Sequence, residues 1–164
     1  MVFCLVGRSG SGKTTVAKEL SKDYNVIQSY TTRPPRYENE WGHTFVESYP
    51  HEHVPKTIAY NEFNGYEYWA TEDQVKGKSI YIIDPAGDEL LRALNKYQVV
   101  TIYFTLDPMI AYDRMVGERG DEKALARAKH DHKLFRVVKT DWVVDADMRI
   151  DEVVKSVKEI IDIY

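Results

Sequence analysis

The sequence predicts an α/β fold in which a parallel sheet carries helices on both faces. Short continuous apolar runs alternate with helical segments along most of the 164 residues. This alternation is typical of parallel strands joined by crossover helices. The length suits one domain with a sizeable core, and the sequence contains no internal repeat. We therefore expect residues 1–164 to form a single domain.

The expected strands and helices follow one another in a regular order. Strands are expected at 2–6, 79–84, 98–104 and 141–144. Helices are expected at 12–22, 86–95, 109–117, 122–137 and in the C-terminal segment from Ile150 to Ile161, whose apolar residues recur with a helical period. Asp84-Pro85 and Asp107-Pro108 each precede a helix, because Asp suits the N-cap and Pro the first helical position.

Two stretches interrupt this order. Residues 29–78 are rich in Tyr, Trp, Thr, Pro and Asn and contain alternating pieces such as GYEYWAT, so we expect an inserted β-containing subdomain there. Residues 118–122 (ERGDE) form a charged loop between two helices. The helix after this loop has four residues on roughly one face, namely Leu125, Ala128, His132 and Phe135.

The composition excludes several classes of protein. The formal net charge of −4 leaves no basic excess for a general nucleic-acid binder. Cys4 is the single cysteine, which excludes a disulfide framework and a cysteine-based metal site. The apolar run at 2–6 is far too short to span a membrane. We expect a cytoplasmic monomer or homodimer that binds neither nucleic acid nor a membrane.

A glycine-rich loop follows the first expected strand. Residues 7–14 (GRSGSGKT) match the phosphate-loop pattern G-x-x-x-x-G-K-[ST] between a strand and a helix. Glycines let the backbone curl so that N–H groups point inward, and the helix N-terminus adds partial positive charge. Lys13 is expected to reach the β- and γ-phosphates, and the Thr14 hydroxyl to ligate Mg²⁺. The pattern predicts a P-loop NTPase sheet with an ATP site made of Gly7, Arg8, Ser9, Gly10, Ser11, Gly12, Lys13, Thr14 and Thr15.

A second phosphate site is predicted in the segment SYTTRPPRYENEWGHTFVE, residues 29–47. Arg33 and Arg36 lie three apart, and the two prolines between them stiffen the backbone. Two guanidinium groups on a rigid turn can clamp a phosphate dianion, although the arginines alone would also suit a solvated basic turn. Glu38 and Glu40, in the same segment, are expected to be solvated.

Taken together, these features resemble the guanylate kinase family. The resemblance rests on the phosphate loop, on S-x-T-T-R-x-P-R leading to a glycine and F-V, and on NGYEYWAT, IIDPAG, ERGD and DWVVDAD, in the family's order over nearly the whole chain. It implies a nucleoside monophosphate kinase in which Mg·ATP gives its γ-phosphoryl group to GMP or dGMP. It also implies a core (1–28, 79–117 and 138–164), a monophosphate-binding subdomain (29–78) and a lid (118–137).

The resemblance assigns five residues to the acceptor nucleotide. Ser29, Arg33 and Arg36 match positions that hold this nucleotide, with the arginines on its phosphate. Thr71 matches a hydroxyl position that helps to read the base. Asp84 matches an acidic position near the base and the metal, where it would contact Mg²⁺ through water.

The resemblance also supplies the expected catalytic residues. Arg119, in ERG, and Arg127, on the next helix, match lid arginines that clamp the transferring phosphoryl group. The reacting phosphates would be surrounded by Mg²⁺ and by four side chains, those of Lys13, Arg36, Arg119 and Arg127. Catalysis would then consist of alignment and charge stabilisation in a site that excludes water.

The chain departs from the family pattern at several positions. His43 stands where the family has a tyrosine on the acceptor phosphate, and imidazole can also donate a hydrogen bond. Tyr68 and Trp69 stand near the family's paired tyrosines, and we expect Tyr68 to line the pocket because its hydroxyl can reach a phosphate. Ala59 stands where the family has a glutamate that reads guanine. Glu62 is close in sequence but would face the other side of the strand unless a bulge intervenes. The preferred base and sugar therefore stay open.

Other functions are compatible with parts of the sequence. A kinase of another nucleoside monophosphate or of a ribose phosphate could use the same scaffold, although the aromatic-rich segment favours a base. A catalytically silent interaction module of the guanylate kinase type is expected to lose the phosphate loop, which this chain keeps. A regulatory NTPase would hydrolyse ATP with no acceptor present.

Overall fold

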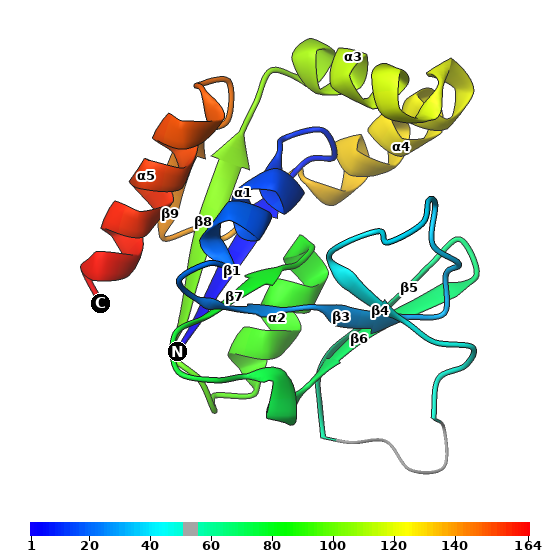
Figure 1. Ribbon diagram of the computed structural model, residues 1–164. Coiled ribbons are helices and arrows are strands. Elements are labelled where there is room, and N and C mark those ends of the chain that lie inside the picture. The colour runs from blue at the N-terminus through cyan, green and yellow to red at the C-terminus, as the bar shows by residue number, and fades with distance from the viewer. Residues whose placement is uncertain (51–55) are drawn as a thin grey trace.

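The computed structural model describes residues 1–50 and 56–164, apart from the side chain of Arg119. Its main feature is a five-stranded parallel sheet in the order β2-β7-β1-β8-β9 (Figure 1). The strands are β1 (Val2–Gly7), β2 (Asn25–Ile27), β7 (Ser79–Ile82), β8 (Val99–Thr105) and β9 (Trp142–Asp145). The four predicted strands are confirmed, and β2 is an addition.

The helices begin and end close to their predicted bounds. They are α1 (Lys13–Leu20), α2 (Pro85–Ala93), α3 (Pro108–Arg119), α4 (Asp121–Leu134) and α5 (Ile150–Asp162). Both predicted N-caps are confirmed, because the Asp84 side chain accepts a hydrogen bond from the Gly87 N–H (2.7 Å) and that of Asp107 accepts one from the Met109 N–H (2.8 Å). None of the described helices combines the length and the apolar character that a membrane span requires.

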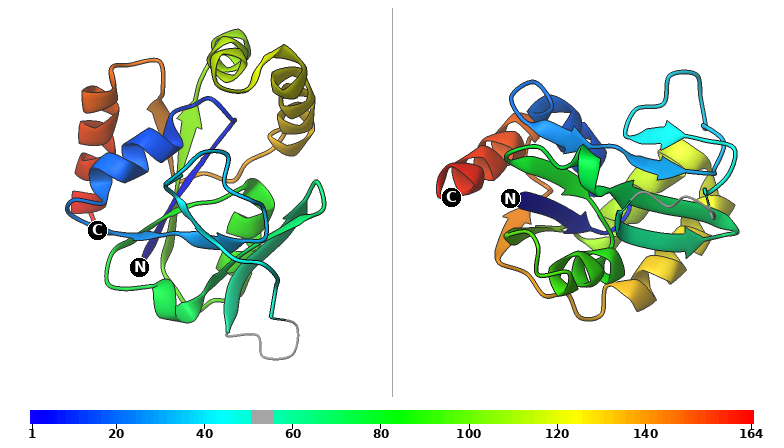
Figure 2. Two further views of the ribbon diagram at one scale, coloured as in Figure 1. Left: turned by 45° about the vertical axis from the view of Figure 1, so that its right-hand side comes forward. Right: turned by 90° about the horizontal axis from the view of Figure 1, so that it is seen from below.

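The parallel sheet is buried between two helical layers. Every residue of β1 is buried, which explains why its sequence is apolar without alternation. Phe3 and Leu5 lie in one core cluster, with residues of α1 and α5, whereas Val2 and Cys4 lie in the other, with Leu91 of α2. The right-hand view in Figure 2 shows α1 (blue) and α2 (green) on opposite faces of the parallel sheet. The predicted α/β class with helices on both faces is confirmed.

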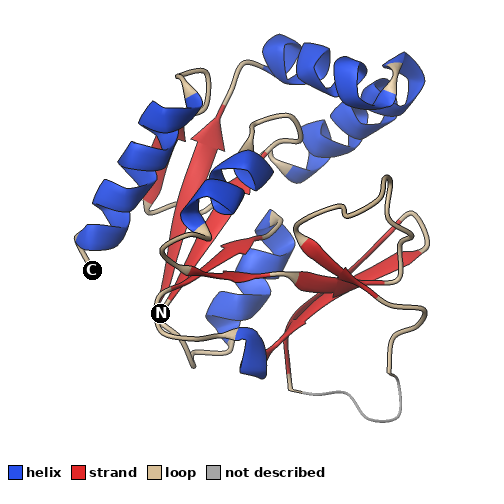
Figure 3. Cartoon of the chain, viewed as in Figure 1, coloured by secondary structure: helices blue, strands red, loops and turns tan. Residues whose placement is uncertain are grey.

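A second sheet has four strands in the order β4-β3-β6-β5 (Figure 3). These are β3 (Ser29–Thr31), β4 (His43–Phe45), β5 (Thr57–Phe63) and β6 (Tyr66–Thr71), and a 3₁₀ turn, η1 (Glu72–Gln74), leads back toward β7. Asn64 and Gly65 join β5 to β6 with φ values of 52° and 75°. Positive φ at both positions is the geometry of a tight hairpin turn, for which Asn-Gly is the favoured pair.

Helix α4 differs from the sequence expectation. Leu125 and His132 are exposed, so the four-residue face predicted for this helix does not point inward, and the helix ends at Leu134. The buried residues are Ala124 and Asp131. Helix α4 packs mainly on α3 and contacts the phosphate loop through polar groups, so it does not cover the sheet with an apolar stripe.

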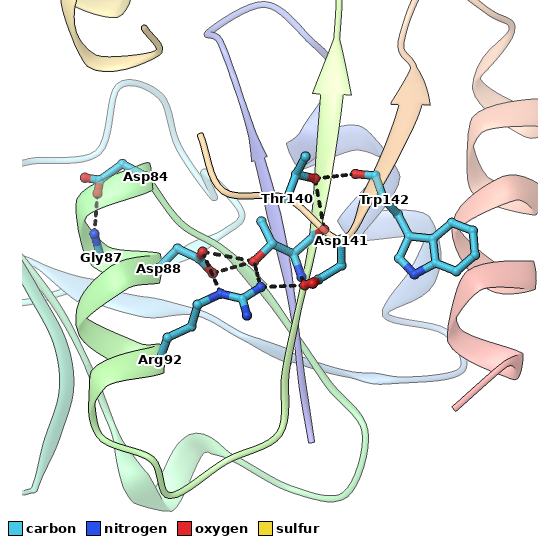
Figure 4. A network of polar contacts seen from close by, with 8 residues as sticks. Asp84, Gly87, Asp88, Arg92, Thr140, Asp141 and Trp142 are labelled. Carbon is cyan, nitrogen blue, oxygen red and sulfur yellow. Dashed lines mark hydrogen bonds and ion pairs between the residues drawn. The ribbon is translucent and has the colours of Figure 1, made fainter. Parts of the chain in front are cut away.

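A polar network centred on the buried residues Asp88 and Thr101 fixes α2 against the sheet (Figure 4). The Thr101 hydroxyl lies 2.9 Å from both carboxylate oxygens of Asp88, and Arg92 Nε donates to Asp88 Oδ2 over 3.2 Å. Asp141 Oδ2 accepts from the Thr101 N–H (2.8 Å) and from Arg92 Nη2 (2.5 Å). Buried polar groups that satisfy one another in this way hold a helix in one position. The network therefore also fixes Asp84 at the start of α2.

Candidate active site

A cavity of about 900 Å³ is lined by residues of the phosphate loop, the second sheet and α4. From the loop and its helix, the predicted residues that line it are Gly7, Ser9 and Lys13. From residues 29–71, they are Ser29, Arg33, Arg36, His43 and Tyr68. Asp84 and Arg127 also line it. The structure thus brings both predicted phosphate sites to one cavity, at the carboxyl ends of β1 and β7, where parallel sheets bind their ligands.

The phosphate loop makes a tight turn that requires glycine and holds Lys13 on its concave side. Gly10 has φ 80°, and a Cβ atom there would lie 2.5 Å from the Ala111 carbonyl oxygen, so only glycine fits. Lys13 Nζ donates to the Arg8 carbonyl oxygen (2.8 Å) and lies 3.1 Å from Ser11 Oγ. The lysine thus lies across the loop, with its ammonium group beside the concave backbone that suits a phosphate.

The remaining predicted loop residues shape the loop and do not line the cavity. They are Arg8, Gly10, Ser11, Gly12, Thr14 and Thr15. Ser11 is buried, whereas Thr14 and Thr15 are exposed on the first turn of α1.

Helix α4 contacts both the phosphate loop and the second sheet. Asp131 Oδ2 accepts a hydrogen bond from the Ser9 N–H over 2.7 Å, and Arg127 Nε donates to Ser9 Oγ over 2.8 Å. The Arg127 guanidinium also lies over the Phe63 ring of β5, 4.6 Å from its centroid. Arg119, the other predicted lid arginine, ends α3, and its side chain lies outside the described part of the structure. Residue Arg127 therefore joins the loop to the second sheet across the cavity.

The Arg33 side chain is held by a carboxylate. Arg33 is 8% exposed, and its Nη2 lies 2.8 Å from Glu40 Oε1. The expectation that Glu40 is solvated was wrong, since its side chain is only 5% exposed, whereas Glu38 is exposed as expected. Burial raises the pKa of Glu40, but the hydrogen bonds and charges of Arg33 and Arg36 outweigh this effect and lower the pKa below its ordinary value. Glu40 is therefore ionised at neutral pH.

His43 is a neutral member of the same site. Its Nδ1 lies 3.0 Å from Ser29 Oγ, and its ring packs edge to face with that of Tyr68. Burial, followed by the positive charge of Arg33, lowers the pKa of His43 below its ordinary value of 6.5. At neutral pH the imidazole therefore contributes hydrogen bonding and not charge.

We expect His43 to titrate below pH 6.5 in the folded protein. Because the unfolded chain binds the proton more readily, the free energy of unfolding should fall as the pH drops through 6.5 and below. The pKa can be measured from the imidazole proton resonances in an NMR titration. A His43 that titrates above pH 6.5 would contradict this prediction.

Neighbouring residues of β6 face opposite sides, as its strand geometry requires. Tyr68 lines the cavity, whereas Trp69 is 3% exposed and stacks on Tyr30 with ring centroids 5.5 Å apart. Thr71, the predicted base-reading hydroxyl, is 1% exposed and is not among the residues that line the cavity. The structure therefore does not bring Thr71 to the site.

Asn61 is a cavity residue that the sequence analysis missed. It lines the cavity on the same strand as Ala59, and its Nδ2 donates to Asp84 Oδ2. Residues two apart on a strand share a face, and this even spacing from Ala59 was the signal that could have found it. Glu62 lies one residue further on, is exposed and does not line the cavity.

Of the two residues expected to contact Mg²⁺, Thr14 fits better. Thr14 is exposed at the start of α1, beside the loop. In contrast, the Asp84 oxygens already accept hydrogen bonds from the Gly87 N–H and from Asn61. The described residues contain no group of three His, Cys, Asp or Glu side chains placed for a metal ion. A hydroxyl ligand suits a Mg²⁺ that is carried mainly by nucleotide phosphates and water.

The sheet, the phosphate loop and the flanking helices define an α/β protein with the fold of the P-loop kinases. In fold it is similar to a guanylate kinase from Anaplasma phagocytophilum, with a TM-score of 0.68 and 18% identity over 99% of this chain and 84% of that chain. It is also similar to an uncharacterized protein from Eubacterium ventriosum ATCC 27560, with a TM-score of 0.55 and 14% identity over 100% of this chain and 99% of that chain. No protein-family model and no curated protein sequence matches the chain. At these identities the similarity shows the fold alone.

Proposed function

We propose that this protein is an ATP-dependent nucleoside monophosphate kinase. One observation carries the proposal, namely that Lys13 of the phosphate loop and the pair Arg33 and Arg36 line the same cavity. Two anion sites that face one cavity suit the transfer of a phosphoryl group from one phosphate to another. The similarity in fold to a guanylate kinase supports the same proposal.

The geometry suggests how the transfer would proceed. The loop amides and Lys13 would hold the triphosphate of ATP, and Arg33 and Arg36 would hold the acceptor phosphate in line with it. Mg²⁺, bound by the nucleotide and the Thr14 hydroxyl, would neutralise developing charge. Arg127 lies between the loop and the second sheet, where it could stabilise the transferring group. In this proposal residues 29–78 bind the monophosphate and residues 118–137 form the lid that excludes water.

GMP or dGMP is the acceptor that the resemblance implies. The cavity has aromatic side chains against which a base can pack, those of Phe63, Tyr66, Tyr68 and Tyr81. Asp84 also lines the cavity. Each of its carboxylate oxygens already accepts one hydrogen bond within the protein and has a second lone pair that can accept from an N–H group of guanine. The aromatic lining favours a nucleotide over a sugar phosphate, because a sugar phosphate has no flat face to stack.

A broader set of nucleoside monophosphates is the second candidate, and Asn61 favours it. A carboxylate offers two acceptors and suits the adjacent N–H groups of guanine, whereas an amide offers one donor and one acceptor. Every base has an edge on which a donor lies beside an acceptor. With Ala59 lacking any polar group and Asn61 lining the cavity, several bases could be accepted.

A coupled assay of ADP release tests the proposal and separates the two candidates. The acceptors are GMP, dGMP, AMP, dTMP and CMP, with ribose 5-phosphate as the control. We expect ADP release with nucleotides and none above background with the sugar phosphate. A preference for guanine of about 100-fold or more, or 2.7 kcal/mol, identifies the first candidate, and values of kcat/KM within about 10-fold identify the second. ADP release that does not depend on any acceptor would contradict the proposed function.

A further inference from the structure

Glu40 is a buried carboxylate inside the site that the proposed function gives to the acceptor phosphate. Its side chain is 5% exposed and contacts both arginines of this site. We propose that Glu40 is a positioning residue, which fixes Arg33 in the orientation that binds the acceptor phosphate. This inference rests on the proposed function and adds a residue that acts through Arg33.

The contacts of Arg33 show which part of its guanidinium Glu40 occupies. Nη2 donates to Glu40 Oε1 over 2.8 Å, and Nη1 donates to Glu40 Oε2 over 3.1 Å. Nη1 also donates to the Pro34 carbonyl oxygen over 2.9 Å. Two parallel bonds to one carboxylate engage the end of the guanidinium that points away from the main chain. Arg33 therefore cannot rotate without breaking a bidentate ion pair.

The other edge of this guanidinium carries a donor without a partner. Arg33 Nε is buried and has no hydrogen-bond acceptor among the described residues. A buried N–H group without an acceptor is unfavourable, so the native protein normally satisfies such a group or reserves it for a ligand. Nε and one terminal nitrogen form the side edge of an arginine, which can bind two phosphate oxygens at once. Arg33 lines the cavity, and we assign this edge to the acceptor phosphate, although other atoms cover Nε in the structure.

Glu40 also organises Arg36. Its Oε2 accepts a hydrogen bond from the Arg36 backbone N–H over 2.6 Å, and its Oε1 lies 3.3 Å from Arg36 Nη1. The carboxylate therefore holds both ends of the turn between the arginines and reduces the repulsion between their charges. Two arginines and one carboxylate leave a net charge of +1, which still attracts a phosphate dianion.

The test compares Glu40→Gln with Glu38→Gln, a matched change at an exposed neighbour on the same segment. Glutamine keeps the size of the side chain but loses its charge and turns one NH₂ group toward the donors of Arg33. We expect Glu40→Gln to raise the KM for the monophosphate about 10-fold while the KM for ATP changes less than 2-fold. Glu38→Gln should leave both KM values unchanged. A merely structural role of Glu40 would move both KM values or neither.

A double-mutant cycle tests whether Glu40 acts through Arg33. Lysine has no side edge to orient, so Glu40→Gln should raise the KM for the monophosphate clearly less in an Arg33→Lys background than in the native protein, and only the part that acts through Arg36 should remain. Equal effects of Glu40→Gln in both backgrounds would overturn the inference. A lower KM for the monophosphate in Glu40→Gln would also overturn it, because Glu40 would then compete with the phosphate.

Direct binding separates this inference from the proposed function. Calorimetric titration with GMP measures the acceptor site without turnover, and Glu40→Gln should weaken binding about 10-fold. Loss of affinity in a protein that transfers no phosphoryl group would support the role of Glu40 and contradict the kinase function. Unchanged affinity in a folded Glu40→Gln protein would overturn the inference even if the kinase is active. Thermal unfolding of each variant checks that the fold is intact.

Discussion

Lys13→Ala is expected to lower kcat for ADP release about 10³-fold, which corresponds to about 4 kcal/mol of transition-state stabilisation. The Lys13 ammonium group lies beside the Arg8 carbonyl oxygen and Ser11 Oγ, on the concave side of the loop. No other described side chain of the loop carries a positive charge into the cavity. The coupled assay with saturating ATP and monophosphate measures this loss directly.

The fold should survive the loss of Lys13, because its side chain is not part of either apolar core cluster. The midpoint of thermal unfolding should therefore shift by only a few degrees, since surface substitutions change stability by about 0.5 kcal/mol or less. Lys18→Ala, on the exposed side of the same helix, is the matched control and should remain fully active. A folded Lys13→Ala protein with normal turnover would refute the role of this residue.

Arg33→Ala is expected to raise the KM for the monophosphate about 100-fold and to leave the KM for ATP within 2-fold. Arg33 follows β3 of the second sheet and lines the cavity, and it carries the edge assigned to the acceptor phosphate. Loss of a hydrogen-bonded charge pair with a phosphate changes binding by about 2–5 kcal/mol. Initial rates with each substrate varied in turn give both constants.

Stability must be measured for the same variant, since Arg33→Ala leaves the buried Glu40 carboxylate without its ion-pair partner. Breaking a buried pair in this way destabilises a protein by about 3–5 kcal/mol. The Arg33→Ala, Glu40→Ala double variant removes both charges and should unfold at a higher temperature than Arg33→Ala alone. If the KM values for ATP and monophosphate rise equally in a folded variant, the assignment of Arg33 to the acceptor is wrong.

The core of the fold was predictable because its signals are local. The strand at Val2–Gly7 is apolar throughout, and Asp84-Pro85 and Asp107-Pro108 mark helix starts with their own side chains. The three-residue strands escaped prediction, since Asn25–Ile27 and His43–Phe45 are too short for an apolar period. Their pairing depends on neighbours that are distant in sequence, and the inner face of α4 likewise depends on the loop against which it packs.

Some residues of the candidate site likewise have a local sequence signal, whereas others depend on tertiary contacts. The phosphate loop was found because one continuous motif encodes its backbone and its lysine. Glu40, Asp131 and Asn61 were missed as site residues because their partners are set by tertiary contacts: Arg33, the Ser9 N–H and Asp84. Partial signals existed, such as the four-residue spacing of Arg127 and Asp131 on one helix face. A charged residue in a polar segment otherwise gives no sign of burial.

Transfer of label from [γ-³²P]ATP is the sharpest test of the proposed function, because it follows the phosphoryl group itself. With monophosphate present, we expect label to appear in a nucleoside diphosphate, and both Lys13→Ala and Arg33→Ala to reduce its appearance. Little label should appear as inorganic phosphate, since the proposed closure of the lid would exclude water. Label released as inorganic phosphate at the same rate with and without monophosphate would contradict the account.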